Sequence, residues 1–507
     1  MLSVPVSPSA PRAGRREWIG LAVIALPCLV YAMDLTVLNL ALPAIAAELK
    51  PTAAQQLWII DIYGFLVAGF LITMGTLGDR IGRRKLLLIG AAAFGLASAA
   101  AAWSDSAEML IALRALLGIA GATLAPSTLS LIRNMFHDAR QRQFAIGVWI
   151  ASFSVGSTIG PLVGGAVLQY LPWGSVFLLA VPVMALLLLV GPVLLPEYRD
   201  PAAGRIDLPS VGLSLAAVLT TIYGFKQLAG QGPAPGALLC VLAGGAIGGL
   251  FVRRQGRLDE PLLDLQLFRR PAFSAAIAAY ALSCLAMFGV YIFITQYLQL
   301  VLGLSPLAAG LATVPWSLGF VVGSLLASRL AERTSPRAVL VGGLLAAAAG
   351  FALLLLARGP WALPVLVLST VVASLGMAPV FAVGNEMIIG SAPPERAGAA
   401  AAISETSSEF SGALGIAVFG SLGTVLYRSA LEGSMPAALP PEAQSAALAT
   451  LGGAVAAAQA AGGPDGEALL GAARAAFMVG LQAAAGTACA VTVLACVVAA
   501  RILRKAG

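Results

Sequence analysis

The chain has 507 residues, of which 59% are hydrophobic and 10% are charged, and it carries a net charge of +7. Because a soluble domain carries about 25% charged residues, this composition excludes a soluble globular protein and indicates an integral membrane protein. The five cysteines lie in apolar stretches without paired or metal-type spacing, which argues against a disulfide framework or a zinc site.

Fourteen apolar stretches follow one another along the chain, each of about 18–31 residues, long enough for a membrane-spanning helix. The sequence therefore predicts an all-α protein with fourteen spans, numbered in chain order. The first span follows basic residues, as in a signal peptide, but its length and Asp34 predict that it is retained. The spans lie near residues 18–46, 57–77, 86–104, 108–132, 143–170, 174–195, 208–226, 235–252, 272–300, 306–328, 338–357, 361–390, 397–427 and 477–500.

The basic residues are distributed unequally between the two sides of this topology. Loops on the side of the N-terminal tail hold most of the 30 Lys and Arg residues. Because cytoplasmic loops carry the excess of Lys and Arg, both termini are predicted to be cytoplasmic. The positive net charge therefore reflects membrane orientation rather than nucleic-acid binding. The basic residues in loops of the opposite side are Lys50, Lys226, Arg358, Arg428 and Arg474.

A weak internal repeat divides the chain. GTLGDRIGRRKLLLIG (75–90), between spans two and three, is echoed by LASRLAERTSPRAVLVGG (326–343), between spans ten and eleven. This spacing of about half the chain predicts two related bundles around a central path, as in many secondary transporters. The predicted parts are a cytoplasmic tail (1–17), a six-helix bundle (18–195), two additional spans with cytoplasmic linkers (196–271), a second six-helix bundle (272–500) with a long external loop (428–476), and a cytoplasmic tail (501–507).

The loop between spans two and three combines glycines with a dense cluster of charges. Gly78 and Gly82 permit a tight turn, and the acid between them can cap a helix start or pair with a neighbouring arginine. The alternative is an ordinary cytoplasmic loop that is basic only because of its side of the membrane. The charged residues are Asp79, Arg80, Arg83, Arg84 and Lys85.

Five acids fall inside predicted spans, against the single cation Arg114. An intramembrane carboxylate usually faces a water-filled path and marks a proton relay or a cation site. Glu405 and Glu409 are four residues apart, so they share a helix face and should titrate as a coupled pair. The acids are Asp34, Asp61, Glu386, Glu405 and Glu409.

Some of these charges also have a structural interpretation. Asp61 can be the ion-pair partner of Arg114 or a supporting hydrogen-bond acceptor. Glu386 lies about one turn from the end of span twelve and can reach the lipid headgroups. Asp34 lies near mid-span with no acid or base one turn away in sequence, so transport chemistry is the favoured role.

Small residues form a strip on span five. Gly156, Gly160 and Gly164 recur every four residues, Gly165 follows directly, and Pro161 permits a kink. Such a strip lets another backbone approach closely, and simple tight packing is the alternative to a specific role.

Aromatic residues can line a cavity and offer π faces to an organic cation, although most membrane aromatics are packing or interface residues. The candidates are Trp58, Tyr63, Trp149, Trp316 and Phe381.

Three of these stretches resemble signature motifs of the major facilitator superfamily. GTLGDRIGRRK (75–85) resembles motif A, which locks the two halves in one state during alternation. LRALLGIAGATLAPSTLSLIRNMF (113–136) resembles motif B, and its Arg114 then takes part in proton coupling. GVWIASFSVGSTIGPLVGGAVL (147–168) resembles the antiporter motif C.

Two further stretches narrow the resemblance. MDLTVLNLALP (33–43), followed by QQLWIIDIYGFLVAGF (55–70), is similar to the opening of the fourteen-span drug:proton antiporters, in their quaternary-ammonium and multidrug efflux branch. AGAAAAISETSSEFSGALGIAVFGSL (397–422) is similar to that branch's thirteenth span. In span ten, VPWSLGFVVGS (314–324) lacks the acidic residue of some members that take divalent cations, so the resemblance does not extend to such a preference.

The resemblance implies a major facilitator fold, with two pseudo-symmetric six-helix bundles and two extra helices between them. It also implies proton-coupled efflux, or antiport, of lipophilic organic cations such as quaternary ammonium biocides and dyes across the bacterial inner membrane. Protonation of Asp34 or of the Glu405/Glu409 pair would compete with cation binding. Export of an endogenous amphiphile or antibiotic on the same fold is the alternative.

We expect a monomer that is driven by a proton gradient, without a cofactor, a metal or a nucleic-acid partner. An enzyme is disfavoured because the one histidine, His137, falls in a predicted cytoplasmic loop without a clustered partner. A directly ATP-driven pump would need GxxxxGK[ST], which does not occur.

Overall fold

The computed structural model describes residues 12–199, 207–231, 234–258, 261, 263, 265–391, 397–436 and 439–506. Within these ranges every regular element is a helix. Fourteen segments are long and apolar enough to cross a membrane, so the predicted all-α fold with fourteen spans is confirmed. Residues 1–11 of the predicted N-terminal tail lie outside the described residues.

The first bundle supplies six spans, two of which are interrupted. Span four breaks between α4 and α5 at Ala122 and Thr123, and a short α7 precedes α8 in span six. Apolar composition keeps these segments in the membrane although the helix is not continuous. The helices are α1 (Arg15–Leu49), α2 (Ala53–Ile81), α3 (Arg83–Ala101), α4 (Ala107–Gly121), α5 (Leu124–Met135), α6 (Ala139–Tyr170), α7 (Ser175–Leu178) and α8 (Ala180–Leu194).

A hairpin of two spans and then the second bundle follow. The hairpin consists of α9 (Leu208–Gln231) and α10 (Pro235–Gln255). Several of the later helices begin with proline in the first turn, where its missing N–H has no partner to lose. The later elements are η1 (Leu267–Arg269), α11 (Pro271–Gln296), η2 (Tyr297–Val301), α12 (Pro306–Arg333), α13 (Pro336–Leu354), η3 (Gly359–Trp361), α14 (Ala362–Gly390), α15 (Ala397–Glu432), α16 (Pro441–Ala449), α17 (Leu451–Ala461) and α18 (Gly463–Ala506).

The long loop after span thirteen differs from its prediction. The sequence predicts a loop at 428–476, but α15 continues to Glu432 and α18 already begins at Gly463. Alanine-rich sequence favours helix, and Asp465 in the first turn of α18 suits the positive end of a helix, so helix extends beyond the apolar stretch. The remaining connection contains two short helices, α16 and α17.

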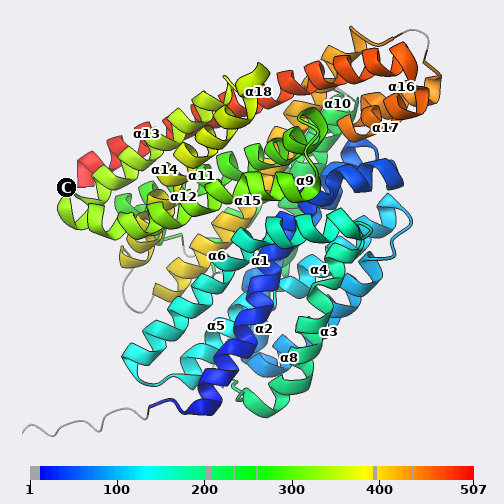
Figure 1. Ribbon diagram of the computed structural model, residues 1–507. Coiled ribbons are helices and arrows are strands. Elements are labelled where there is room, and N and C mark those ends of the chain that lie inside the picture. Colours follow the sequence, from blue (N-terminus) through cyan, green and yellow to red (C-terminus); the bar gives the residue numbers. More distant parts are fainter. Residues whose placement is uncertain are drawn as a thin grey trace, which may run out of the picture.

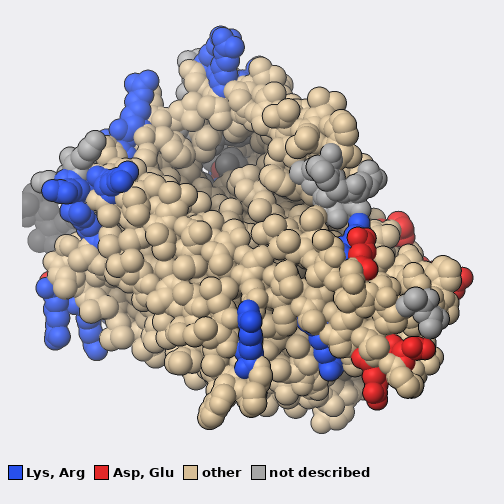
Figure 2. All heavy atoms as spheres, turned by 90° about the horizontal axis from the view of Figure 1, so that it is seen from above, with Lys and Arg blue, Asp and Glu red and all other residues tan. Residues whose placement is uncertain are grey.

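The two ends of the molecule are distinct (Figure 1). The terminal end carries the start of α1 and the end of α18, and the loop end carries α16 and α17. Most of the Lys and Arg side chains visible in Figure 2 gather toward the terminal end, and the Asp and Glu side chains gather toward the loop end. The same surface is hollowed near the upper edge of that view.

The two bundles contact each other in the half of the molecule nearest the loop end. Gly165 on α6 lies against the backbone of Pro306 and Leu307 at the start of α12. Gln299 donates a hydrogen bond to the carbonyl oxygen of Leu40, 3.1 Å away, in the last third of α1. These contacts close the molecule at the loop end.

The α9–α10 hairpin packs beside the junction of the bundles. Phe65 of α2, Ile222 of α9, and Ala413 and Ala417 of α15 form one buried apolar cluster. The hairpin therefore touches one helix of each bundle, which places it beside the seam between them.

Candidate substrate and proton site

Asp34 and Arg114 form an ion pair inside the first bundle. The Nη1 atom of Arg114, on α4, lies 2.5 Å from Oδ2 of Asp34, on α1. Arg114 is 1% exposed and also donates from Nε to the carbonyl oxygen of Ile59, at 3.1 Å. The ion-pair partner of Arg114 in the structure is thus Asp34, whereas the sequence suggests Asp61 as one possible partner. Asp61 is itself buried, at 1% exposure, on α2.

An aromatic ring completes the surroundings of Arg114. The guanidinium carbon lies 4.5 Å from the centroid of Tyr63, whose side chain is fully buried. A cation over an aromatic face is attracted by the ring quadrupole, most strongly where water is excluded. Tyr63 therefore holds Arg114 in place, a more specific role than the cavity lining expected from sequence.

The two glutamates of α15 lie apart from this pair. Glu409 accepts a hydrogen bond from the hydroxyl of Tyr31 at 3.0 Å, which connects α15 of the second bundle to α1 of the first. Glu405, one turn earlier on α15, is exposed although it lies inside a spanning helix. It is also close enough to Tyr31 for the two side chains to interact electrostatically. Both carboxyl groups therefore border the space between the bundles.

The cavity that the Asp34 side chain lines belongs to the first bundle. This cavity, of about 10 Å³, lies against α7 and α8, with Val176 and Phe177 in its wall. That Asp34 and the Glu405/Glu409 pair both take part in proton and cation exchange stays a prediction. The connection of Asp34 to Glu409 runs through side chains.

Tyr31 provides this connection and was not a candidate from sequence. It lies three residues before Asp34 on α1, so a helical-face argument from Asp34 points to it. Its ring centroid is 5.9 Å from that of Tyr63 and 5.8 Å from that of Phe153.

Aromatic rings form a row on each side of the glutamates. In the first bundle, Tyr31 and Phe153 continue to Trp149, at 4.9 Å between ring centroids. In the second bundle, Phe381 lies 5.0 Å from Tyr280, which interacts with Ser408, the neighbour of Glu409. Two carboxyl groups between aromatic rows are a suitable site for an apolar organic cation.

The remaining predicted residues lie elsewhere. Trp316 pairs with Tyr291 at 5.7 Å, and Trp58 packs against the apolar cluster between α2, α9 and α15. Glu386 is exposed one turn before the end of α14 at the terminal end, a position that suits contact with headgroups.

The glycine strip of α6 has a closely packed neighbour, as its spacing predicts, and this neighbour is α1. A side chain on Gly156 would meet the backbone of Leu29, and one on Gly164 would meet Val37. Gly160 between them faces the backbone of Met33, next to Asp34. The strip therefore lets α6 fix the segment of α1 that carries the ion pair. Pro161, on the same helix, lies against Gly310 of α12.

The charged loop between α2 and α3 is held within the first bundle. Asp79 pairs with Arg83 at 2.5 Å, so it is a salt-bridge partner rather than a helix cap. Arg84 donates to the carbonyl oxygens of Pro192 and Leu195, at 3.0 and 2.9 Å, at the end of α8.

The surroundings of this loop are equally local. Gly78 packs against Arg83, Arg80 is exposed, and Gly82 has a φ of 112°, which favours glycine. In the described part of the chain, the ion pairs of this loop stay inside the first bundle. This agrees with a molecule whose bundles meet at the opposite end. The described residues contain no cluster of three His, Cys, Asp or Glu side chains that could hold a metal ion.

The chain is similar to characterised membrane proteins over nearly its whole length. It is 44% identical to the multidrug efflux pump LfrA of Mycolicibacterium smegmatis over 98% of this chain and 99% of the relative. It is 35% identical to the methyl viologen resistance protein SmvA of Salmonella typhimurium over 91% and 93%. It is 34% identical to the puromycin resistance protein pur8 of Streptomyces alboniger over 86% and 88%.

Solved structures support the same fold. A bacterial homologue of the human lysosomal transporter Spinster, in an inward-facing and unoccupied conformation, superposes with a TM-score of 0.69 at 19% identity, covering 97% of this chain and 99% of that one. The peptide transporter POT in complex with sulfate gives a TM-score of 0.63 at 18% identity, covering 96% and 95%. The family model of the major facilitator superfamily matches residues 24–416. The chain therefore belongs to the major facilitator superfamily and is a multi-pass membrane transporter rather than an enzyme.

Proposed function

We propose that the protein exports lipophilic organic cations from the bacterial cytoplasm in exchange for protons, by alternating access. Both termini and the terminal end lie in the cytoplasm, and the loop end faces outward, in agreement with the excess of Lys and Arg at the terminal end. The observation that carries the proposal is the position of Glu405 and Glu409 between two aromatic rows, next to the Tyr31 bridge.

The charge balance of the site favours a cationic substrate. Arg114 is paired with Asp34, and the ion pairs of the described residues include none between an arginine and Glu405 or Glu409. Burying a bare carboxylate costs several kcal/mol, and either a proton or a bound cation removes that cost. Protons and cations then compete for the same groups, which is the requirement for exchange.

The exchange proceeds in two half-cycles. With the molecule closed at the loop end, a cation enters from the terminal end and binds beside Glu409 and the aromatic rows. After the bundles rearrange, a proton from outside binds to Glu409 and the cation leaves. Return to the first state releases the proton into the cytoplasm.

The relatives support export of cations. LfrA is a multidrug efflux pump, and SmvA confers resistance to methyl viologen, a flat aromatic dication. A flat aromatic cation fits between facing aromatic side chains. Quaternary ammonium biocides and cationic dyes share the combination of fixed charge and apolar surface.

A second candidate is export of an antibiotic. The puromycin resistance protein and the tetracenomycin C resistance and export protein of Streptomyces are 34% and 32% identical to this chain. Many antibiotics are amphiphiles with planar rings, and the aromatic rows can accept them without a charge interaction.

Transport in inverted membrane vesicles tests the proposal. Ethidium should accumulate when a pH gradient is applied, and Asp34→Asn and the double variant Glu405→Gln/Glu409→Gln should each abolish gradient-driven accumulation. Glu386→Gln is the matched control, because it neutralises an exposed acid at the end of α14. Unimpaired accumulation in the first two variants would refute the carboxylate mechanism. Accumulation of an uncharged antibiotic but not of ethidium would favour the second candidate.

A further inference from the structure

Tyr31 connects the two bundles at the level of the proposed site. Its hydroxyl donates to Oε1 of Glu409 at 3.0 Å, and its side chain is 5% exposed. The two residues are 378 positions apart in sequence and belong to α1 and α15. The hydrogen bond therefore depends on how the bundles are placed relative to each other.

Tyr31 is also connected to the ion pair of the first bundle, through the ring of Tyr63. Its ring lies 5.9 Å from Tyr63, and the guanidinium of Arg114 lies 4.5 Å from the centre of Tyr63. Arg114 in turn binds Asp34, which is one turn from Tyr31 on the same helix. A continuous path of packed side chains thus leads from Glu409 to Asp34.

We propose that Tyr31 is the positioning residue that transmits the protonation state of Glu409 to the Asp34–Arg114 pair. While Glu409 is ionised, its hydrogen bond with Tyr31 holds α1 against α15. When Glu409 is protonated, or when it pairs with a bound cation instead, this bond weakens and α1 is free to move with the first bundle. The inference rests on the proposed proton exchange and adds the residue that couples it to the bundle movement.

The chemistry of the bond supports this role. A hydrogen bond from a phenol to a carboxylate is charge-assisted and about twice as strong as its neutral equivalent. Protonation places a new O–H bond on the Glu409 carboxyl group and removes its negative charge, and no other bond is made or broken. The Tyr31 hydroxyl then loses its charged acceptor.

Other titratable groups surround Glu409, and none replaces Tyr31 as the link to α1. Glu405 lies one turn earlier on α15, Tyr280 and Cys284 face the glutamates from α11, and Tyr63 faces them from α2. Glu405 is exposed, so it is placed to exchange protons with water. Of these groups, the hydroxyl of Tyr31 is the one that donates to Glu409 from α1.

Tyr31→Phe tests the inference, because it removes the hydroxyl and keeps the ring. In proteoliposomes, gradient-driven ethidium accumulation should fall about tenfold, the loss expected for one hydrogen bond to a charged group. The protons released per ethidium bound by the purified protein at neutral pH should rise, because without the charge-assisted bond more Glu409 is protonated before ethidium displaces the proton. Damage to packing alone would reduce the amount of ethidium bound but would leave this ratio unchanged. Tyr297→Phe is the matched control, because its hydroxyl bonds to Ala357 within the second bundle, and it should keep the wild-type ratio.

The double variant Tyr31→Phe/Glu409→Gln separates the possible outcomes. If Tyr31 acts through Glu409, the double variant performs no worse than Glu409→Gln alone. Additive losses, or a wild-type proton ratio in Tyr31→Phe, would overturn the inference while leaving the proposed function intact. If wild-type protein releases no proton when ethidium binds, the proposed function fails, and this inference with it.

Discussion

Asp34 and Arg114 place two opposite charges inside the apolar part of the first bundle, and each lowers the free-energy cost of burying the other. Removing ions from water is expensive, and their attraction offsets this only with good geometry and additional hydrogen bonds. Here the second hydrogen bond, to the carbonyl oxygen of Ile59, and the ring of Tyr63 use the remaining faces of the guanidinium. The pair is therefore a fixed unit on which the movement of α1 can act.

Removal of Arg114 should destabilise the protein. We expect Arg114→Met to lower the free energy of unfolding by about 3–5 kcal/mol, because Asp34 is left as an uncompensated charge. Adding Asp34→Asn should recover part of this loss, since no bare charge remains. Thermal unfolding of the purified variants measures both effects. A double variant less stable than Arg114→Met would contradict the ion-pair explanation.

Individual residues were predicted unevenly. Asp34, Arg114, Glu405 and Glu409 stand out in sequence because charges are rare in membrane helices. Their partners could not be assigned, because Arg114 and Asp34 are 80 positions apart and only the assembly of the first bundle brings them together. Tyr31 resembles any interfacial tyrosine until its contact with α15 is known.

Among the helices, α6 shows how side-chain size controls the site. Its glycines allow the backbone of α1 to approach, and this contact aligns the turn of α1 that contains Asp34. The four-residue period was sufficient to predict a close neighbour, but not which helix would be that neighbour.

Alanine substitutions on α6 should distinguish its faces. Gly156→Ala should destabilise the protein by about 1–3 kcal/mol, because its new methyl group meets the backbone of Leu29. Gly147→Ala, on the same helix, meets nothing within 4 Å and should be neutral or slightly stabilising. Melting temperatures of the two variants test this, and equal effects would refute the contact.

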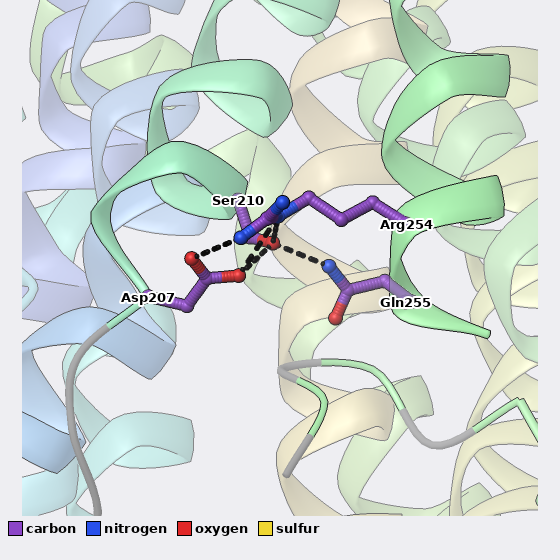
Figure 3. A network of polar contacts seen from close by, with 4 residues as sticks. All are labelled: Asp207, Ser210, Arg254 and Gln255. Atoms are coloured by element: carbon purple, nitrogen blue, oxygen red, sulfur yellow. Dashed lines mark hydrogen bonds and ion pairs between the residues drawn. The ribbon is translucent and has the colours of Figure 1, made fainter. Parts of the chain in front are cut away.

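The α9–α10 hairpin is fastened at the terminal end by a polar network (Figure 3). Arg254 donates to both carboxyl oxygens of Asp207, at 3.1 and 2.8 Å, and Gln255 donates to Ser210 at 2.7 Å. The hydrogen bonds from Arg254 lower the pKa of the Asp207 carboxyl below its ordinary value. The network therefore joins the first turn of α9 to the last turn of α10.

Acid should loosen this network. A carboxyl group with a lowered folded pKa contributes full stabilisation above about pH 3.9, its ordinary value, and loses it as pH falls through the folded value. Wild-type protein should be more stable than Asp207→Asn at neutral pH, and the difference in melting temperature should shrink as the pH falls below the ordinary pKa of aspartate and disappear once Asp207 is protonated in the folded protein. A difference that persists in acid would show that the contribution of Asp207 does not depend on its charge.

On the scale of the whole molecule, the contacts between the bundles at the loop end describe one stage of a transport cycle. Leu57 on α2 packs against Gly420 on α15, and Gln299 bonds to Leu40. Alternation requires these contacts to separate while others form at the terminal end, where the charged loop of residues 78–85 lies.

A disulfide across the seam should arrest this movement. In Leu57→Cys/Gly420→Cys, the new Gly420 side chain occupies space that the Leu57 side chain vacates, so a disulfide can form. Oxidation should abolish ethidium transport, and a reducing agent should restore it. The two single variants, which keep the five native cysteines, are the controls. Full transport by completely cross-linked protein would show that the seam does not open.

The sequence predicts the helical architecture of the molecule better than it predicts which end of the molecule is closed. Hydropathy identified all fourteen spans, and the internal repeat indicated two bundles, because both follow from membrane thickness and duplication. The extent of α18 was underestimated, since hydropathy detects only the part in lipid. Which end is closed depends on contacts between residues far apart in sequence, such as Gly165 with Leu307, and no local pattern encodes this.

The length of α18 has a consequence at the cell surface. Its 44 residues extend about 66 Å, roughly twice the thickness of the hydrocarbon core, so several turns project beyond the membrane beside α16 and α17. In the proposed orientation, this helical projection lies outside the cell and offers a folded epitope on a protein that is otherwise mostly embedded in the membrane. An antibody fragment raised against it would bind intact cells and provide a rigid marker for electron microscopy of a small membrane protein.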